Sequence, residues 1–222
     1  MIFLLSGFLI LILCYFIAGI FDIRRNMFVN SINSLEKDEI CLTFDDGPDP
    51  VMTPKILDIL NKYNIQANFF LIGMNSHKHK SIVKRIYSEG HIIGCHTYNH
   101  KLYFPLYPFN RIENELITTN NVISSITSEE ITLFRPPFGI TNPKISKVLK
   151  KLGMICIGWD IRSFDTITHN SEKLYRRVKK GIDKGGSVIL FHDRCESTLD
   201  ILERIIIYCI DKKLKFTTIN VA

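Results

Sequence analysis

The chain has 222 residues, 46% hydrophobic and 23% charged, a balance that fits one substantial domain or two small ones and excludes disorder, collagen-like repeats and low-complexity fibres. Its 28 basic and 22 acidic residues give a formal net charge of +6, a weak indication of an anionic partner. The basic residues are spread along the chain, so nothing supports a nucleic-acid tract, and we expect no nucleic-acid partner.

Residues 1–21 carry no charged side chain and are dominated by Ile, Leu and Phe. As a helix they would span about 30 Å, the thickness of a bilayer core. No Lys or Arg precedes the apolar run, which disfavours a cleaved signal peptide. We therefore expect an uncleaved transmembrane anchor, with a buried core helix as the other interpretation.

Residues 22–37 form a polar connector in this interpretation, and strand-like and helix-like stretches alternate from residue 38 onward. Strands are expected at residues 40–44, 67–72, 92–95, 133–134, 154–159, 187–191 and 216–219. Helices are expected from residue 54 and over residues 79–89, 111–126, 143–151, 172–180 and 199–212.

This alternation of apolar strands and amphipathic helices predicts a parallel sheet covered by helices. The fold class is α/β, specifically a distorted (β/α) barrel with about seven parallel strands, preceded by one N-terminal transmembrane helix. The six cysteines show no CxxC spacing and are expected to be small buried hydrophobic residues. The polar clusters follow predicted strands, where α/β folds place their sites.

The first cluster contains the adjacent carboxylates Asp45 and Asp46, followed by Gly47 and Pro48. Two neighbouring carboxylates are costly if both stay ionised without a partner, and a divalent cation removes that cost. One carboxylate could then bind metal while the other serves as a base. The alternative is a plain turn, because Asp-Gly and Gly-Pro pairs are common in turns.

The second cluster contains His96 and His100, four residues apart. If the segment is helical, both imidazoles lie on one face and can share one metal ion. With Asp46 they would form a site of two histidines and one carboxylate, which suits zinc, iron or cobalt. Alone, such a histidine pair is a weak signal.

Three further segments follow predicted strands. Arg135 begins a loop stiffened by two prolines and a glycine, which would hold its guanidinium beside a carboxylate. Residues 158–166 carry Asp165, and His192 stands at the end of a predicted strand. A histidine beside a carboxylate has its protonated form stabilised, as a general acid requires. Each segment alone could be an ordinary loop.

In this order, the five segments resemble the polysaccharide deacetylase family, the NodB-homology or family 4 carbohydrate esterases. The resemblance covers roughly residues 38–220, and the sequences TFDDGP at residues 43–48 and HTYNH at residues 96–100 are its most specific parts. It implies Asp46, His96 and His100 as ligands of a divalent metal ion, zinc or else cobalt, iron or nickel. It implies four catalytic roles: Asp45 as base, Arg135 orienting that base, His192 as acid, and Asp165 tuning the acid.

The resemblance also assigns residues to substrate binding. Leu190 would line the pocket for the acetyl methyl group, and Phe138 would offer a backbone N–H to the oxyanion. Pro136, in the same stiff loop, is assigned to the substrate wall. The family often has Asp-x-x-Asp-Trp in the fourth segment, where this chain has Arg162 for the first Asp and Thr166 for the Trp. That departure puts the substrate in doubt more than the chemistry.

The function implied is metal-dependent hydrolysis of N-acetyl groups on amino sugars of a polysaccharide or oligosaccharide, releasing acetate. The domains would be a transmembrane anchor or uncleaved signal at 1–21, a connector at 22–37 and a catalytic domain at 38–222. Alternatives are an O-deacetylase or deformylase acting on a lipid-linked sugar, and an inactive sugar-binding relative. The expected partners are a carbohydrate and, through the anchor, the membrane.

The orientation of the anchor stays open. Arg24 and Arg25 follow the apolar run directly, and positive flanks tend to stay on the cytoplasmic side. A polysaccharide substrate instead favours an extracytoplasmic catalytic domain.

Overall fold

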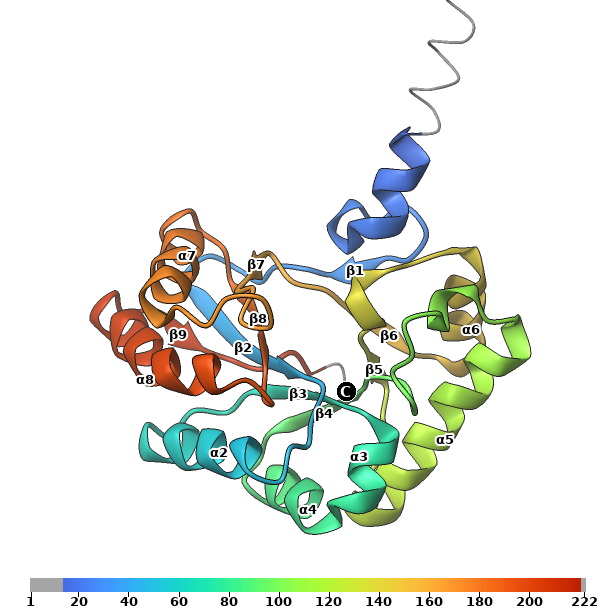
Figure 1. The fold of residues 1–222 in the computed structure, drawn as a ribbon, viewed down its shortest axis with the longest axis horizontal. Helices are drawn as coiled ribbons and strands as arrows, with labels where there is room; N and C mark the ends of the chain where they lie inside the picture. The colour runs from blue at the N-terminus through green and yellow to red at the C-terminus, as the bar shows by residue number, and fades with distance from the viewer. Residues whose placement is uncertain (1–13, 221–222) are drawn as a thin grey trace, which may run out of the picture.

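The computed structural model describes residues 14–220, in which nine strands form one curled, all-parallel sheet with helices packed around it (Figure 1). The strands are β1 (Ser31–Ile32), β2 (Glu39–Asp45), β3 (Asn68–Leu71), β4 (Ile92–Cys95), β5 (Leu133–Phe134), β6 (Ile155–Ile157), β7 (Ile161–Arg162), β8 (Val188–His192) and β9 (Lys215–Phe216). Their order is β1-β6-β5-β4-β3-β2-β8-β7, with β9 beside β2. Within the described chain, β1 and β7 are the two edge strands of this order and do not pair with each other, so the barrel is open.

The helices are α2 (Met52–Lys62), α3 (Gly73–Lys78), α4 (Lys80–Ser88), α5 (Phe109–Thr127), α6 (Pro143–Leu152), α7 (Ser171–Asp183) and α8 (Glu196–Asp211), with short 3₁₀ turns at η1 (Ile23–Arg25), η2 (Phe104–Leu106) and η3 (Pro137–Gly139). Helix α6 shows how the sequence sets such bounds. The Asn142 side chain accepts the N–H groups of Lys144 and Ile145, and Pro143 occupies the first turn. Gly153 ends the helix with φ of 64°.

All seven predicted strands and all six predicted helices are present, which confirms the parallel α/β sheet. Nine strands replace the expected seven, because β1 and β7 each have one apolar residue within a polar segment and show no apolar run. The six-residue helix α3 was also not predicted. The distorted barrel that we expected is instead an open, curled half-barrel.

The predicted connector at residues 22–37 is packed against the domain rather than free of it. Ile23 and Val29 are buried in the hydrophobic core, and β1 pairs with the edge strand β6. The polar side chains make local bonds: Asn26 Oδ1 accepts the N–H of Ser31 at 3.0 Å. The polar composition of this segment therefore reflects tight turns at the sheet edge.

Residues 1–13 of the predicted anchor lie outside the described residues, and residues 14–21 are helical. The carbonyl of Ile20, near the end of this helix, accepts the backbone N–H of Thr141 at 3.1 Å, which joins the N-terminal segment to the domain. Among residues 14–220 no helix has both the length and the apolarity needed to cross a bilayer.

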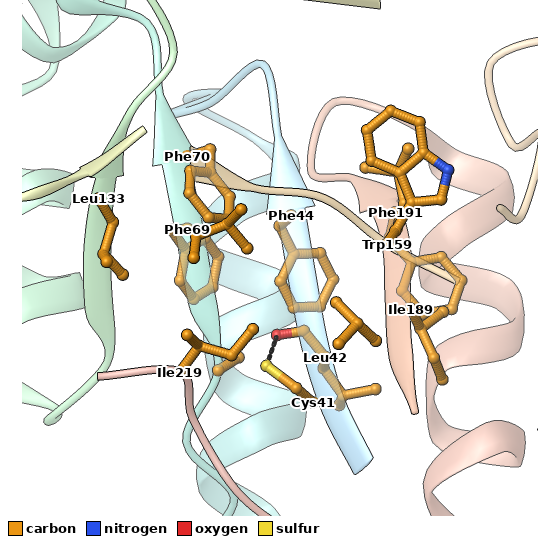
Figure 2. Packing of buried hydrophobic residues seen from close by; sticks show 14 of the residues in the cluster. Cys41, Leu42, Phe44, Phe69, Phe70, Leu133, Trp159, Ile189, Phe191 and Ile219 are labelled. Carbon is orange, nitrogen blue, oxygen red and sulfur yellow. Dashed lines mark hydrogen bonds between the residues drawn. The ribbon is translucent and has the colours of Figure 1, made fainter. Parts of the chain in front are cut away.

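Aromatic rings fill the space beside the central strands. Phe44 on β2 stacks on Phe69 of β3 and Phe191 of β8, with ring centroids 5.0 and 5.9 Å apart (Figure 2). These residues are direct neighbours in the strand register, so the ring ladder supports the pairing of the three strands. Four of the six cysteines, Cys41, Cys95, Cys156 and Cys209, are buried free thiols as predicted, whereas Cys14 is exposed and Cys195 is half-buried.

The strand register brings the carboxyl ends of the strands to one edge. Asp45 lies opposite both Phe70 and His192, and Cys95 lies opposite Phe134. The residues that directly follow β4 and β5, His96 and Arg135, therefore come to the same rim as the end of β2.

Two glycines offer a matched test of the packing near this rim. Both have positive φ, but a Cβ on Gly139 would lie 2.5 Å from the ring of Trp159, whereas a Cβ on Gly153 would meet nothing within 4 Å. We expect Gly153→Ala to cost about 1 kcal/mol of unfolding free energy, from left-handed strain alone. Gly139→Ala should cost about 1–3 kcal/mol more through overpacking.

Chemical unfolding followed by the fluorescence of Trp159, the single tryptophan, measures both variants. Equal losses for the two variants would contradict the close contact between Gly139 and Trp159.

Candidate active site

A cleft of about 100 Å³ opens at the carboxyl ends of the strands. It is lined by Asp45, Asp46, His96, His100, Phe138, Gly139, Trp159, Arg162, Thr166, Leu190, His192 and Arg194. A larger hollow of about 440 Å³ lies between β1, α6 and β6, but Lys150 is its single charged lining residue. Chemistry rather than size therefore marks the smaller cleft as the candidate site.

Three predicted metal ligands meet in this cleft. Oδ1 of Asp46 lies 3.5 Å from Nε2 of His96 and 3.3 Å from Nε2 of His100. One ligand atom from each residue lies within 4.8 Å of the others. The structure thus brings together the three residues that the sequence singled out.

The histidine segment is not helical, so the geometry that would have placed both imidazoles on one helix face is wrong. Thr97 and His100 have φ of 65° and 48°, and the segment is a tight loop. Glu115 on α5 holds this loop, since its Oε2 accepts the N–H groups of Tyr98 and Asn99, both at 2.9 Å. A distant glutamate therefore supplies the rigidity that a helix would have provided.

The hydrogen bonding of the two histidines suits a metal ion. Nδ1–H of His96 donates to the carbonyl of Arg135 at 2.7 Å, which leaves Nε2 as the ring nitrogen that faces Asp46. Burial, with a smaller contribution from His96, lowers the pKa of His100 to about 4, so the imidazole of His100 is neutral near pH 7. Two imidazoles and one carboxylate fit a divalent ion such as zinc, iron or cobalt.

Asp45 is held from behind by a fully buried arginine. The Arg135 guanidinium donates to Asp45 Oδ1 at 2.8 Å and to Thr43 Oγ1 at 2.7 Å. It also donates to the carbonyls of Ile157 at 3.1 Å and Gly158 at 2.7 Å. Oδ2 of Asp45 is left on the cleft side, 3.8 Å from Nε2 of His96. The predicted pairing of Arg135 with Asp45 is present.

His192 and Asp165 form the second predicted pair. Nδ1–H of His192 donates to Asp165 Oδ1 at 2.8 Å, and Asp165 Oδ2 accepts the Thr198 hydroxyl at 2.6 Å. Burial alone would lower the pKa of His192, but the hydrogen bond and charge of Asp165 outweigh burial and raise it. The cleft-facing imidazole is therefore stabilised in its protonated form.

The residues predicted for substrate binding divide into two groups. Leu190 and Phe138 line the cleft; Phe138 has φ of 61°, and its ring centroid lies 5.1 Å from that of His100. Pro136 is buried and does not line the cleft, which corrects its assignment to the substrate wall. The position of Pro136 is one that stiffens the loop from behind.

Arg194 was missed by the sequence reasoning. Its Nε–H donates to Oδ2 of Asp46 at 2.7 Å, so one carboxylate oxygen is held while Oδ1 faces the two histidines. Its position directly after His192 and Asp193 was the one available signal. Asp160 accepts the N–H groups of Ser187 and Val188 and so holds the start of β8.

Comparisons with known proteins agree with this geometry. The family model described as "Polysaccharide deacetylase" matches residues 33–157, more than half of the chain. The chain belongs to the polysaccharide deacetylase family. The resemblance seen in the sequence is thereby confirmed, and with it the expectation of a polysaccharide deacetylase enzyme.

Individual relatives carry related names. A "Peptidoglycan-N-acetylglucosamine deacetylase" of Bacillus cereus is 35% identical over 189 residues, covering 82% of this chain and 67% of the relative. "Peptidoglycan-N-acetylmuramic acid deacetylase PdaC" of Bacillus subtilis is 31% identical, covering 82% of this chain but 38% of PdaC. The crystal structure of the Bc1960 peptidoglycan N-acetylglucosamine deacetylase superposes with a TM-score of 0.80 at 32% identity, covering 85% of this chain and 90% of that one.

One buried carboxyl beside this polysaccharide deacetylase site is not part of the cleft lining. Asp193 is fully buried; its Oδ2 accepts the Thr53 hydroxyl at 2.6 Å, and its Oδ1 has no partner among the described residues. Burial raises the pKa of Asp193 to about 8. A Cβ on Gly47 would lie 2.0 Å from this carboxyl, so the glycine permits the close approach.

Asp193 makes the stability of the fold depend on pH. In the unfolded chain the carboxyl loses its proton near its ordinary pKa of 3.8, whereas the folded chain keeps it to about pH 8. Folding therefore takes up a proton between these values, and this contribution to stability falls as pH rises, by at most about 1.4 kcal/mol per pH unit.

We expect Asp193→Asn to abolish this dependence. The unfolding free energy of the variant should then rise relative to that of the wild type between pH 5 and pH 8. Urea unfolding at each pH measures the difference, with the exposed Asp211→Asn as control. A constant difference across this range would contradict a protonated Asp193.

Proposed function

We propose that this protein hydrolyses the N-acetyl group of amino sugars in a peptidoglycan-type glycan, releasing acetate and a free amine. The observation that carries the proposal is that three sets of polar side chains line one cleft. One is Asp45, paired with Arg135; the second is the Asp46–His96–His100 cluster; the third is His192, paired with Asp165.

Asp46, His96 and His100 would hold the divalent ion, which when bound polarises an acyl carbonyl and makes water more acidic. The chain's own contribution to that site is orientation. Arg194 fixes one oxygen of Asp46, and the carbonyl of Arg135 fixes the ring of His96.

Asp45 acts as the base in the proposed reaction. Because Oδ1 is bonded to Arg135, Oδ2 is the oxygen available to accept a proton from the attacking water. The water oxygen then forms a bond to the acetyl carbon. The fixed guanidinium stabilises the carboxylate in this orientation and lets the base work without rearrangement.

His192 acts as the acid. Its Nδ1–H is bonded to Asp165, so Nε2–H is the proton available to the leaving nitrogen. Protonation allows the carbon–nitrogen bond to break, and the products are acetate and the amino sugar. Buried Leu190 offers the apolar wall beside which the acetyl methyl group would lie.

The names of the relatives support a glycan with N-acetylated sugars, since the Bacillus cereus and Bacillus subtilis proteins are named for peptidoglycan. We also propose that residues 1–21 anchor the domain to a membrane, with the catalytic domain outside the cytoplasm. The uncharged sequence of this segment supports an anchor, and the polymeric substrate supports the orientation.

The first test uses the full chain in detergent, with N-acetylglucosamine oligomers and peptidoglycan as substrates. With zinc or cobalt added we expect acetate release that a chelator abolishes. Asp45→Asn should lower kcat by about 10²-fold or more, because a carboxamide cannot take the proton, and should keep its metal. Asp211→Asn is the matched control.

Wild-type turnover by a metal-loaded Asp45→Asn variant would refute the assignment of the base. Release of formate from an N-formylated glycan, with no acetate from the acetylated one, would replace the acetyl substrate by a formyl one. If the protein neither binds metal nor releases an acyl group, that result would favour an inactive sugar-binding relative.

The second test follows the pH profile of kcat/KM. His192 must be protonated to act, so activity falls as pH rises through its pKa. Asp165→Asn removes the charge that raises this pKa, and we expect the alkaline limb to move to lower pH. Thr198→Val removes one hydrogen bond to Asp165 but keeps its charge, and should move the limb less. An unmoved limb in Asp165→Asn would contradict His192 as the acid.

A further inference from the structure

Arg162 is the one arginine lining the cleft that has no carboxylate partner among residues 14–220. Arg194, also in the lining, is paired with Asp46 at 2.7 Å, and Arg135 behind the cleft is paired with Asp45 at 2.8 Å. The described part of the chain contains no carboxylate oxygen within 4.0 Å of the Arg162 guanidinium. Its charge is therefore available to something that enters the cleft.

The position of Arg162 is fixed by the fold. It ends β7 directly opposite Leu190 in the strand register, beside the apolar wall of the cleft. The Arg177 Nε–H donates to the Arg162 carbonyl at 2.9 Å, which secures the backbone. This places the guanidinium on the rim, next to the groups that would act on the acetamide.

Aromatic rings support the side chain without neutralising it. The Arg162 guanidinium carbon lies 4.7 Å from the ring centroid of Phe164 and 5.9 Å from that of Trp159. A stacked guanidinium loses less freedom when it binds a ligand and keeps its in-plane N–H donors for a planar or tetrahedral oxyanion.

The balance of charge in the cleft favours an anionic ligand. Asp45 and Asp46 are each matched by an arginine, and Asp165 is matched by His192. Arg162 adds one positive charge that has no carboxylate of the described chain within 4.0 Å, and a divalent ion would add two more. A neutral glycan has no charged group that could interact with this positive electrostatic potential.

We propose that Arg162 is a specificity residue that binds an anionic substituent, a carboxylate or a phosphate, on the sugar chain being deacetylated. This inference rests on the proposed function and names the class of substrate for it: an acidic glycan in preference to a neutral one. The guanidinium donates paired N–H groups to the oxyanion while the acetamide lies beside Leu190.

Substrates that differ only in charge test the proposal. A peptidoglycan-derived glycan with free lactyl carboxylates is compared with the same glycan after methyl esterification. In the phosphate arm, N-acetylglucosamine 1-phosphate is compared with the neutral methyl glycoside of N-acetylglucosamine. At low salt we expect wild-type kcat/KM to be about fivefold higher for the carboxylate form, through KM, and the preference to shrink as salt increases. A preference confined to the phosphate arm would assign the site to phosphate.

Arg162→Gln should bring the ratio of kcat/KM for charged over esterified glycan close to one. Arg162→Asp, which places at this position the residue the family often has, should reverse the ratio. Arg176→Gln removes the same charge from an exposed position on α7 and should leave the ratio and the basal activity unchanged. Equal effects of Arg162→Gln and Arg176→Gln, or a wild-type ratio of one in both arms, would overturn the proposal.

Calorimetric binding separates this inference from the deacetylase proposal. The charged and esterified glycans are titrated into wild-type protein and Arg162→Gln without following turnover. Tighter binding of the charged glycan that Arg162→Gln abolishes supports the anion site even if no acetate is released. Equal binding of both glycans by wild-type protein counts against the site whatever the activity.

Discussion

Arg135 is a fully buried cation on which the arrangement of the cleft depends. Burying a charge is costly unless it is paired and its hydrogen-bonding groups are satisfied. Here the guanidinium bonds to a carboxylate and a hydroxyl from β2 and to two carbonyls at and just after the end of β6, and it lies 4.1 Å from the ring of Phe70 on β3. Removing it would leave the Asp45 carboxylate buried without its partner, a loss of about 3–5 kcal/mol.

This interaction also explains how two adjacent carboxylates can have different roles. Asp46 has φ of 75°, so the chain turns sharply directly after Asp45. The side chain of Asp45 then meets Arg135 inside the barrel, while that of Asp46 meets the histidines and Arg194. Separate cations and donors reduce the repulsion between the two carboxylates, and each is held for one task.

Much of the fold could be predicted because buried parallel strands are continuous apolar runs. The core of β2 and the run in β8 show this pattern, and their polar final residues, Asp45 and His192, mark the rim. Strands β1 and β7 each have one apolar residue within a polar segment, so, unlike the equally short β5, they showed no apolar run that could reveal them. The same limit explains why residues 22–37 resembled a free connector.

The site was predictable where its residues follow strands, and less so where distant contacts shape it. His96 and His100 were identified by spacing, but their loop conformation depends on Glu115, which is far along the chain on α5. Arg194 acts on Asp46, a residue 148 positions away. Sequence order cannot show such a pairing, because it exists only once the ends of β2 and β8 lie side by side.

Burial separates the residues proposed to carry the chemistry from those proposed to face the substrate. Asp45, Arg135 and Asp165 are buried, and each is fixed by contacts from several elements, so substitution there would disturb the whole network. Phe138, Arg162 and Thr166 line the same cleft but are exposed. A change at this outer layer can alter what the cleft accepts without moving the residues proposed as base, acid and metal ligands. This chain departs from the common family pattern at Arg162 and Thr166, and both residues lie in that outer layer. A change of substrate that keeps the same reaction would have to arise in this layer.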